Sequence, residues 1–143
     1  MTESAAVEDV VARYRAASEA GDTAAIMRLL SSDVELVSPI SGRMVFRGHA
    51  DVELLTAAVY ATLSQVRWLD EAGDERVRLL RGEAKVGPFR VEDAMVLELS
   101  EDGRIERIRP HFRPWLGLTA FALRVGPKVA RHRGILMRAL RRS

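Results

Sequence analysis

Residues 89–112 read FRVEDAMVLELSEDGRIERIRPHF, two stretches of alternating apolar and polar side chains joined by the turn sequence SEDG. Alternation with a period of two is typical of β-strands, and the turn between them predicts an antiparallel hairpin. In the second strand Ile108, Pro110 and Phe112 share one face, because side chains alternate along a strand. Arg109 and His111 fall on the other face. We therefore expect the apolar face to meet the core and His111 to point into solvent or a subunit interface.

The spacing of the apolar residues before this hairpin changes once, from a helical period to a period of two. Apolar residues recur at helical spacing within residues 4–20, 22–30 and 49–63, with short extended segments near 34–37 and 43–47. From residue 66 onward the period is two, with expected strands at 66–70, 76–81, 89–99 and 104–112. Helices followed by strands predict an α+β fold, in which three N-terminal helices cover one face of an antiparallel sheet.

Charge divides the chain into an acidic and a basic part. Residues 1–106 hold all 20 acidic residues and 12 Lys and Arg, whereas residues 107–143 hold 10 Lys and Arg and no acid. Residues 116–143 are expected to form one or two helices with a stripe that contains Phe121, Val125 and Val129, and Pro127 suits a first helical turn after Gly126. We therefore divide the chain into a domain at 1–115 and a basic amphipathic helical tail at 116–143.

The partners of this tail stay open at the level of sequence. It could dock on the acidic surface of its own domain or of a second subunit, or lie on an anionic membrane with Trp115 and Phe121 at the interface. We favour a structural or dimer-associated tail, because its apolar stripe needs a partner. Nucleic-acid binding is not favoured, since the body is acidic and the tail has few aromatic residues for stacking.

Composition excludes several classes of function. The 143 residues contain no cysteine, which removes thiolate catalysis, disulfides and cysteine-bound zinc. The three histidines show no metal-binding spacing, so no metal site is expected. The sequence has neither an apolar run long enough to cross a bilayer nor a visible secretory signal, and we expect a cytoplasmic protein.

Two stretches carry a resemblance to a known family. VVARYRAASEAGDTAAIMRLLSSDVELVSPISGRMVFRG, residues 10–48, and EDGRIERIRPHF, residues 101–112, resemble the SnoaL-like branch of the nuclear transport factor 2-like superfamily. That superfamily includes polyketide cyclases, ketosteroid isomerases and limonene epoxide hydrolases. The resemblance covers residues 5–114 and implies a cone in which three helices and a curved sheet enclose a pocket for a small apolar molecule. It also implies a homodimer and no cofactor.

The resemblance to the isomerases implies roles for individual residues. Tyr14 matches the tyrosine that donates a hydrogen bond to the developing oxyanion, although a buried tyrosine that only satisfies its hydroxyl has equal weight. Ser38 stands where the isomerases have their general base, and Met95 where they have a protonated aspartate, so both catalytic carboxyls are missing. Asp93 has the same strand parity as Met95 and Leu97, and it is the one candidate for a pocket carboxylate. The alternative is an Asp93 that is simply hydrated.

The expected site therefore combines two candidate catalytic residues, Tyr14 and Asp93, with a set of pocket residues. The pocket residues are Ser38, Trp68, Met95, Leu97, Ile108, Pro110 and Phe112. Three functions remain open: a cofactor-independent cyclase, isomerase or epoxide hydrolase relative, a non-catalytic binder of a polyketide-like or steroid-like molecule, and a membrane-surface module that acts through the basic tail.

Overall fold

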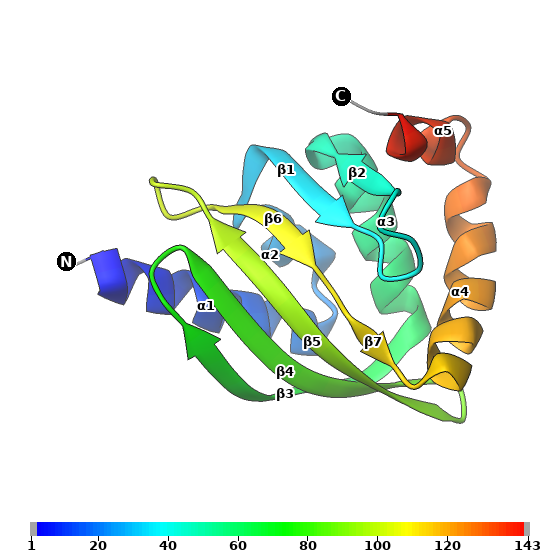
Figure 1. The fold of residues 1–143 in the computed structure, drawn as a ribbon, viewed down its shortest axis with the longest axis horizontal. Coiled ribbons are helices and arrows are strands. Elements are labelled where there is room, and N and C mark those ends of the chain that lie inside the picture. Colours follow the sequence, from blue (N-terminus) through cyan, green and yellow to red (C-terminus); the bar gives the residue numbers. More distant parts are fainter. Residues whose placement is uncertain (1–2, 142–143) are drawn as a thin grey trace.

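The computed structural model describes the backbone of residues 3–141 and the side chains of residues 10–141. Figure 1 shows helices at both ends of the chain and a central sheet. The elements in chain order are α1 Glu3–Ala20, α2 Thr23–Met27, β1 Leu30–Val37, β2 Val45–Arg47, α3 Gly48–Thr62, β3 Leu63–Gly73, β4 Val77–Val86, β5 Phe89–Leu99, β6 Ile105–Arg109, β7 Phe112–Arg113, α4 Trp115–Ala130 and α5 Ile135–Leu140. The predicted α+β class with three N-terminal helices is confirmed.

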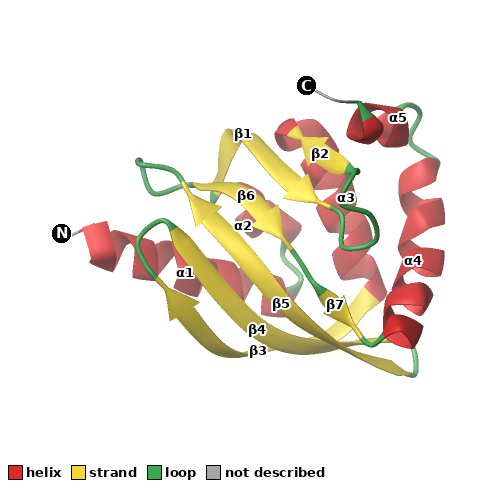
Figure 2. Ribbon diagram, in the orientation of Figure 1, coloured by secondary structure: helices red, strands yellow, loops and turns green. Residues whose placement is uncertain are grey.

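The strands form one curved sheet, which Figure 2 shows with its helices on the concave side. The strand order is β2-β1-β6-β5-β4-β3, and β7 pairs with β5. Every pair is antiparallel except β1 and β6, which run parallel and were not expected to do so. The exception is physically reasonable, because β1 and β6 lie far apart in the chain and no hairpin forces them to be antiparallel.

Several strands are longer than the alternation predicted. β1 begins at Leu30 rather than near residue 34, and β3 begins at Leu63, directly after the last residue of α3. The expected strand at 104–112 is instead divided into β6 and β7. Pro110 lies at the break, and proline has no backbone N–H with which to continue the ladder.

The two faces of this last segment agree with the predicted parity. Ile108 and Pro110 are buried and Phe112 is half-buried, whereas Arg109 and His111 are exposed. His111 therefore points away from the core, as the alternation of side chains predicted.

The C-terminal helices pack on the body of the molecule. In α4 the predicted stripe is confirmed, since Phe121, Val125 and Val129 are buried. Pro127 lies inside α4 and does not begin a second helix, which corrects the expected boundary. Gly134 instead precedes α5, in a left-handed conformation with φ of 80°. None of the helices in the described part of the chain is long and apolar enough to span a membrane.

One ion pair joins α5 to the acidic part of the chain. Nε and Nη2 of Arg138 each donate a 2.8 Å hydrogen bond to the carboxylate of Asp51, at the start of α3. This pair fixes the last helix against the third, so part of the basic segment does meet an acid of its own chain.

Candidate functional site

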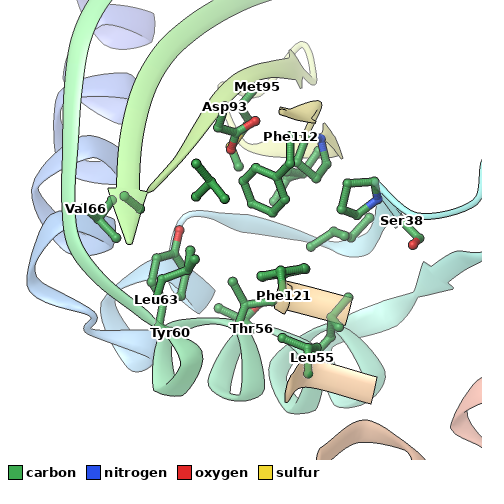
Figure 3. A pocket seen from close by; sticks show the side chains of 18 of the residues that line it. Ser38, Leu55, Thr56, Tyr60, Leu63, Val66, Asp93, Met95, Phe112 and Phe121 are labelled. Atoms are coloured by element: carbon green, nitrogen blue, oxygen red, sulfur yellow. The ribbon is translucent and has the colours of Figure 1, made fainter. Parts of the chain in front are cut away.

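A cavity of about 120 Å³ lies between the concave face of the sheet and helices α1, α3 and α4. Figure 3 shows side chains from both layers pointing into it. Most of its walls are apolar. Of the residues expected to form the site, those that line the cavity are Tyr14, Ser38, Trp68, Asp93, Met95, Ile108, Pro110 and Phe112.

Leu97 is the exception among the expected pocket residues. It has the same parity on β5 as Asp93 and Met95, and it is fully buried, but it does not line the cavity. The cavity ends at Met95, and two residues farther along the strand the core is closed by packed side chains. The alternation of side chains therefore predicted the correct face of the strand but not where the cavity ends.

Asp93 is buried in this apolar surrounding. Its side chain is 8% exposed, and Oδ1 accepts a 3.0 Å hydrogen bond from the backbone N–H of His111. No cation within the described residues forms an ion pair with it. Burial raises the pKa of Asp93 to about 7, and the amide and the charge of His111 oppose that rise. Both protonation states of Asp93 are therefore accessible near neutral pH.

Two phenols lie near this carboxyl. The hydroxyl of Tyr14, on α1, donates to Sδ of Met95 at 3.0 Å. Tyr60, on α3, interacts with Tyr14, and Figure 3 shows its hydroxyl pointing into the cavity toward the strand that carries Asp93. The pKa of Tyr14 is raised well above its usual value and that of Tyr60 to about 12, mainly by burial, and the charge of Asp93 contributes to both rises. Both phenols therefore remain protonated donors at neutral pH.

The position of Tyr14 depends on a buried hydrogen-bond chain. Nε1 of Trp68 donates to Oγ of Ser18 at 2.7 Å, and that hydroxyl donates to the backbone oxygen of Tyr14 at 2.7 Å. The rings of Tyr14 and Trp68 lie 6.5 Å apart. Trp68 is thus both a wall of the cavity and an anchor between β3 and α1.

Ser38 lines the cavity but is engaged locally. Its Oγ accepts a 3.1 Å hydrogen bond from the backbone N–H of Ile40, in the loop between β1 and β2. The serine therefore stabilises this loop, and the structure provides no histidine beside it among the lining residues.

The charged residues of the lining do not converge. Arg67 pairs with Glu83 at 3.2 Å, and its side chain is 67% exposed. Asp93 is the one aspartate among the described lining residues, so no second aspartate joins it in the cavity. Within the described residues there is also no cluster of three or more His, Asp or Glu side chains that could hold a metal ion.

The sequence interpretation missed two groups that shape the cavity. Tyr60 lies four residues after Thr56, which also lines the cavity. Helical spacing could therefore have indicated that Tyr60 faces the same side of its helix. Phe121, Val125 and Val129 of α4 also line the cavity, although they were assigned to the tail. Phe121 was expected at a membrane interface in one reading, but it is buried and packs edge-on against Phe112, with ring centroids 4.8 Å apart.

Solved structures resemble this architecture closely. An uncharacterised bacterial protein with a cystatin-like fold from Silicibacter pomeroyi DSS-3 matches with a TM-score of 0.83 and 22% identity, over 91% of this chain and 93% of that one. A steroid delta-isomerase from Pseudomonas aeruginosa matches with a TM-score of 0.80 and 22% identity, over 90% and 94%. A putative SnoaL-like polyketide cyclase from Jannaschia sp. CCS1 matches with a TM-score of 0.69 and 11% identity, over 85% and 95%.

No protein-family model and no curated protein matches the chain. The structural matches, which also include an NTF-2 like protein and an epoxide hydrolase, share one fold. The chain therefore has the nuclear transport factor 2-like fold, and the resemblance seen in the sequence is confirmed at that level. Identities of 22% or less establish the fold and leave the chemistry to the site.

Proposed function

We propose that this protein binds a small apolar carbonyl compound in the cavity and transfers a proton on it without a cofactor, as a cyclase or an isomerase does. The observation that carries the proposal is Asp93, an unpaired carboxyl buried among apolar side chains, with a pKa raised to about 7. A group whose pKa lies near the working pH can act as a base in one step and as an acid in the next.

The proposed reaction begins with the carboxylate form of Asp93. It removes a proton from the carbon beside the ligand carbonyl, so that a C–H bond breaks and the carboxyl O–H forms. In a β,γ-unsaturated ketone the electron pair of the broken C–H bond forms a C=C bond to the carbonyl carbon, and the C=O π pair moves onto the oxygen, which gives a dienolate. The protonated Asp93 then donates the proton to the γ carbon, the double bond shifts from β,γ to α,β as C=O re-forms, and the carboxylate is restored.

The phenols would stabilise the enolate oxygen. Tyr14 now donates to a thioether sulfur, which is a weak acceptor, so a ligand oxygen would be a better partner for the same proton. Tyr60 offers a second donor in the same region. One donor of this kind contributes about 10²–10³ to the rate in enzymes that stabilise an oxyanion.

The size of the cavity limits the ligand. One water molecule needs about 10–15 Å³ of such a cavity. A cavity of about 120 Å³ therefore holds roughly ten non-hydrogen atoms. A molecule of one or two rings would fit, whereas a steroid would have to protrude from the cavity. The names of two structural neighbours, a steroid delta-isomerase and a polyketide cyclase, agree with chemistry on a cyclic ketone but say nothing of this ligand.

A second candidate function is binding without turnover. The residues at the isomerase base and second-donor positions, Ser38 and Met95, carry no carboxyl, and the Ser38 hydroxyl is occupied by the amide of Ile40. In this case Asp93 would only position or recognise a polar group of the ligand.

The two candidates are separated by following isomerisation directly. The protein is incubated with a β,γ-unsaturated cyclohexenone, and formation of the conjugated α,β-unsaturated ketone is followed by NMR. Proton transfer predicts isomerisation above the buffer rate, loss of that acceleration in Asp93→Asn, and nearly unchanged binding of the ketone by that variant. Asp70→Asn, which alters an exposed aspartate on β3, is the control. A wild-type protein that binds the ketone without isomerising it is a binder, and the catalytic proposal then fails.

A further inference from the structure

The outward side of α4 is mostly apolar. Its exposed residues are Trp115, Leu116, Thr119, Leu123, Arg124, Pro127 and Ala130. Trp115 is 71% exposed and Leu123 is 72% exposed, and Arg124 is the one charged residue in this set. A soluble surface rarely leaves such side chains together unless something covers them.

Cations lie within and after this apolar strip. Arg124 in α4 and Arg131, Arg133 and Arg141 after it are exposed, and α5 adds the exposed side chain of Met137. Among the described residues of 116–141, Arg138 is the one cation in an ion pair with a carboxylate. Since residues 107–143 contain no acid, these positive charges have no nearby counterpart in the segment itself. We name the outward side chains of α4 and α5 the α4–α5 face.

The charge on the α4–α5 face decides between two occupants. A second copy docked through the same face would bring a second set of these arginines into one interface, and residues 107–143 hold no acid that could pair with them. An anionic partner with an apolar layer has the complementary chemistry. We propose that the α4–α5 face docks this protein on an anionic lipid bilayer, with Trp115 and Leu123 in the interface and Arg131 and Arg133 on the headgroups.

The same helix connects the bilayer to the cavity. Phe121, Val125 and Val129, on the inward side of α4, line the cavity, and Figure 1 shows α4 and α5 along one edge of the molecule. Ile40, in the loop between β1 and β2, also lines the cavity and is 52% exposed, so the cavity wall reaches the surface there. Docking through α4 would place the cavity beside the membrane, from which an apolar ligand could enter. This inference does not depend on turnover by Asp93.

Vesicle sedimentation of the full chain tests the proposal. The wild type should sediment with vesicles of phosphatidylcholine and one-third phosphatidylserine, and much less with phosphatidylcholine alone. The double variant R131Q/R133Q should partition about 25-fold more weakly, because each basic side chain near an anionic surface contributes a factor of about five. Leu123→Ser should weaken partitioning about ten-fold or more, since it removes a large apolar side chain from the interface.

Matched controls lie elsewhere on the surface. Leu69→Ser alters an exposed leucine on β3, and Arg28→Gln alters an exposed arginine after α2; neither should change partitioning. The proposal is overturned if the wild type ignores anionic vesicles, if L123S binds them as the wild type does, or if an RNA oligonucleotide binds more tightly than the vesicles. It is also overturned if L123S converts a dimer into a monomer in light scattering, because the face would then be covered by a second copy.

Discussion

The backbone N–H of His111 donates a 3.0 Å hydrogen bond to Oδ1 of Asp93, while the imidazole of His111 lies on the outer side of the sheet. Nδ1 of that ring lies 3.0 Å from the backbone oxygen of Ala94. The backbone of this segment therefore contacts the candidate site directly, whereas the imidazole of His111 acts on Asp93 only through its charge. Because the amide favours the charged carboxyl, it limits the rise in the pKa of Asp93 that burial causes.

The raised pKa of Asp93 predicts a pH dependence of stability. The folded pKa of about 7 lies above the ordinary value of 3.8, so the native state binds more protons between these values than the unfolded chain does. The stabilisation that the protonated form of Asp93 contributes is complete below the pKa of 3.8 in the unfolded chain, and it is lost as pH rises through about 7. The free energy of unfolding should fall by about 2–3 kcal/mol between about pH 5 and about pH 7.5 relative to Asp93→Asn, measured by urea denaturation.

Asp93→Asn is a suitable reference, because its amide oxygen can still accept the hydrogen bond from His111. Glu71, by contrast, has a lowered pKa because it accepts a hydrogen bond from Arg78, so its contribution is lost as pH falls and does not overlap this window. If the wild type and Asp93→Asn keep a constant difference in stability across the range, Asp93 titrates normally and the proposed acid-base role loses its basis.

Tyr14→Phe should show whether the hydroxyl of Tyr14 serves ligand binding or the stability of the fold. The phenol donates to a weak acceptor in Met95, so its removal should cost the fold less than about 1 kcal/mol. Binding of a carbonyl ligand should fall by up to about ten-fold, because a hydrogen bond to the neutral carbonyl oxygen is lost. Calorimetric titration with the cyclohexenone and urea denaturation of the same variant measure the two effects. A large loss of stability with unchanged ketone affinity would show that the hydroxyl serves the fold alone.

Periodicity was sufficient to predict the inward faces of the strands. Ile108, Pro110 and Phe112 alternate with charged residues, and burial of the apolar set leaves one orientation for the strand. The same parity placed Asp93 with Met95. These predictions required local information only, because the period of a strand fixes the direction of each side chain.

The limits of the cavity and the identity of its far wall could not be predicted in this way. Leu97 has the correct parity yet lies beyond the hollow, and Phe121 belongs to a stripe that showed one buried side without showing what it covers. Both depend on how α4 folds back on the sheet, which is set by contacts between residues distant in the chain. The parallel pairing of β1 with β6 is non-local for the same reason.

Ser18→Ala should destabilise the fold, because it leaves the indole N–H of Trp68 without an acceptor. Ser18 is fully buried, and its hydroxyl accepts from Nε1 of Trp68 at 2.7 Å. An unsatisfied buried donor costs about 1–3 kcal/mol, so the midpoint of urea denaturation should shift accordingly. Ser64→Ala, at an exposed position on β3, should have almost no effect. In a double-mutant cycle, Ser18→Ala should cost much less when Trp68 is already Phe; equal costs in both backgrounds would contradict the hydrogen bond.

Gly117→Ala tests the close packing of α4 on β5. A Cβ at Gly117 would lie 2.5 Å from Cγ1 of Val91 and 3.0 Å from the backbone oxygen of Arg90, so the helix or the strand must shift. Such overpacking costs about 1–3 kcal/mol, and it should also lower ketone affinity, because α4 and Val91 both line the cavity.

Gly126→Ala is the matched control in the same helix. A Cβ there meets no atom within 4 Å outside its immediate neighbours in the chain. The gain in helix propensity is opposed by the restriction that Pro127 places on the preceding residue, so stability should change by less than about 1 kcal/mol. Thermal unfolding compares the stability of the two variants directly; because Gly126 itself lines the cavity, ketone titration compares Gly117→Ala with the wild type. Equal destabilisation by both substitutions would mean that α4 does not approach β5 at Gly117, and the cavity would then lack the wall that this helix provides.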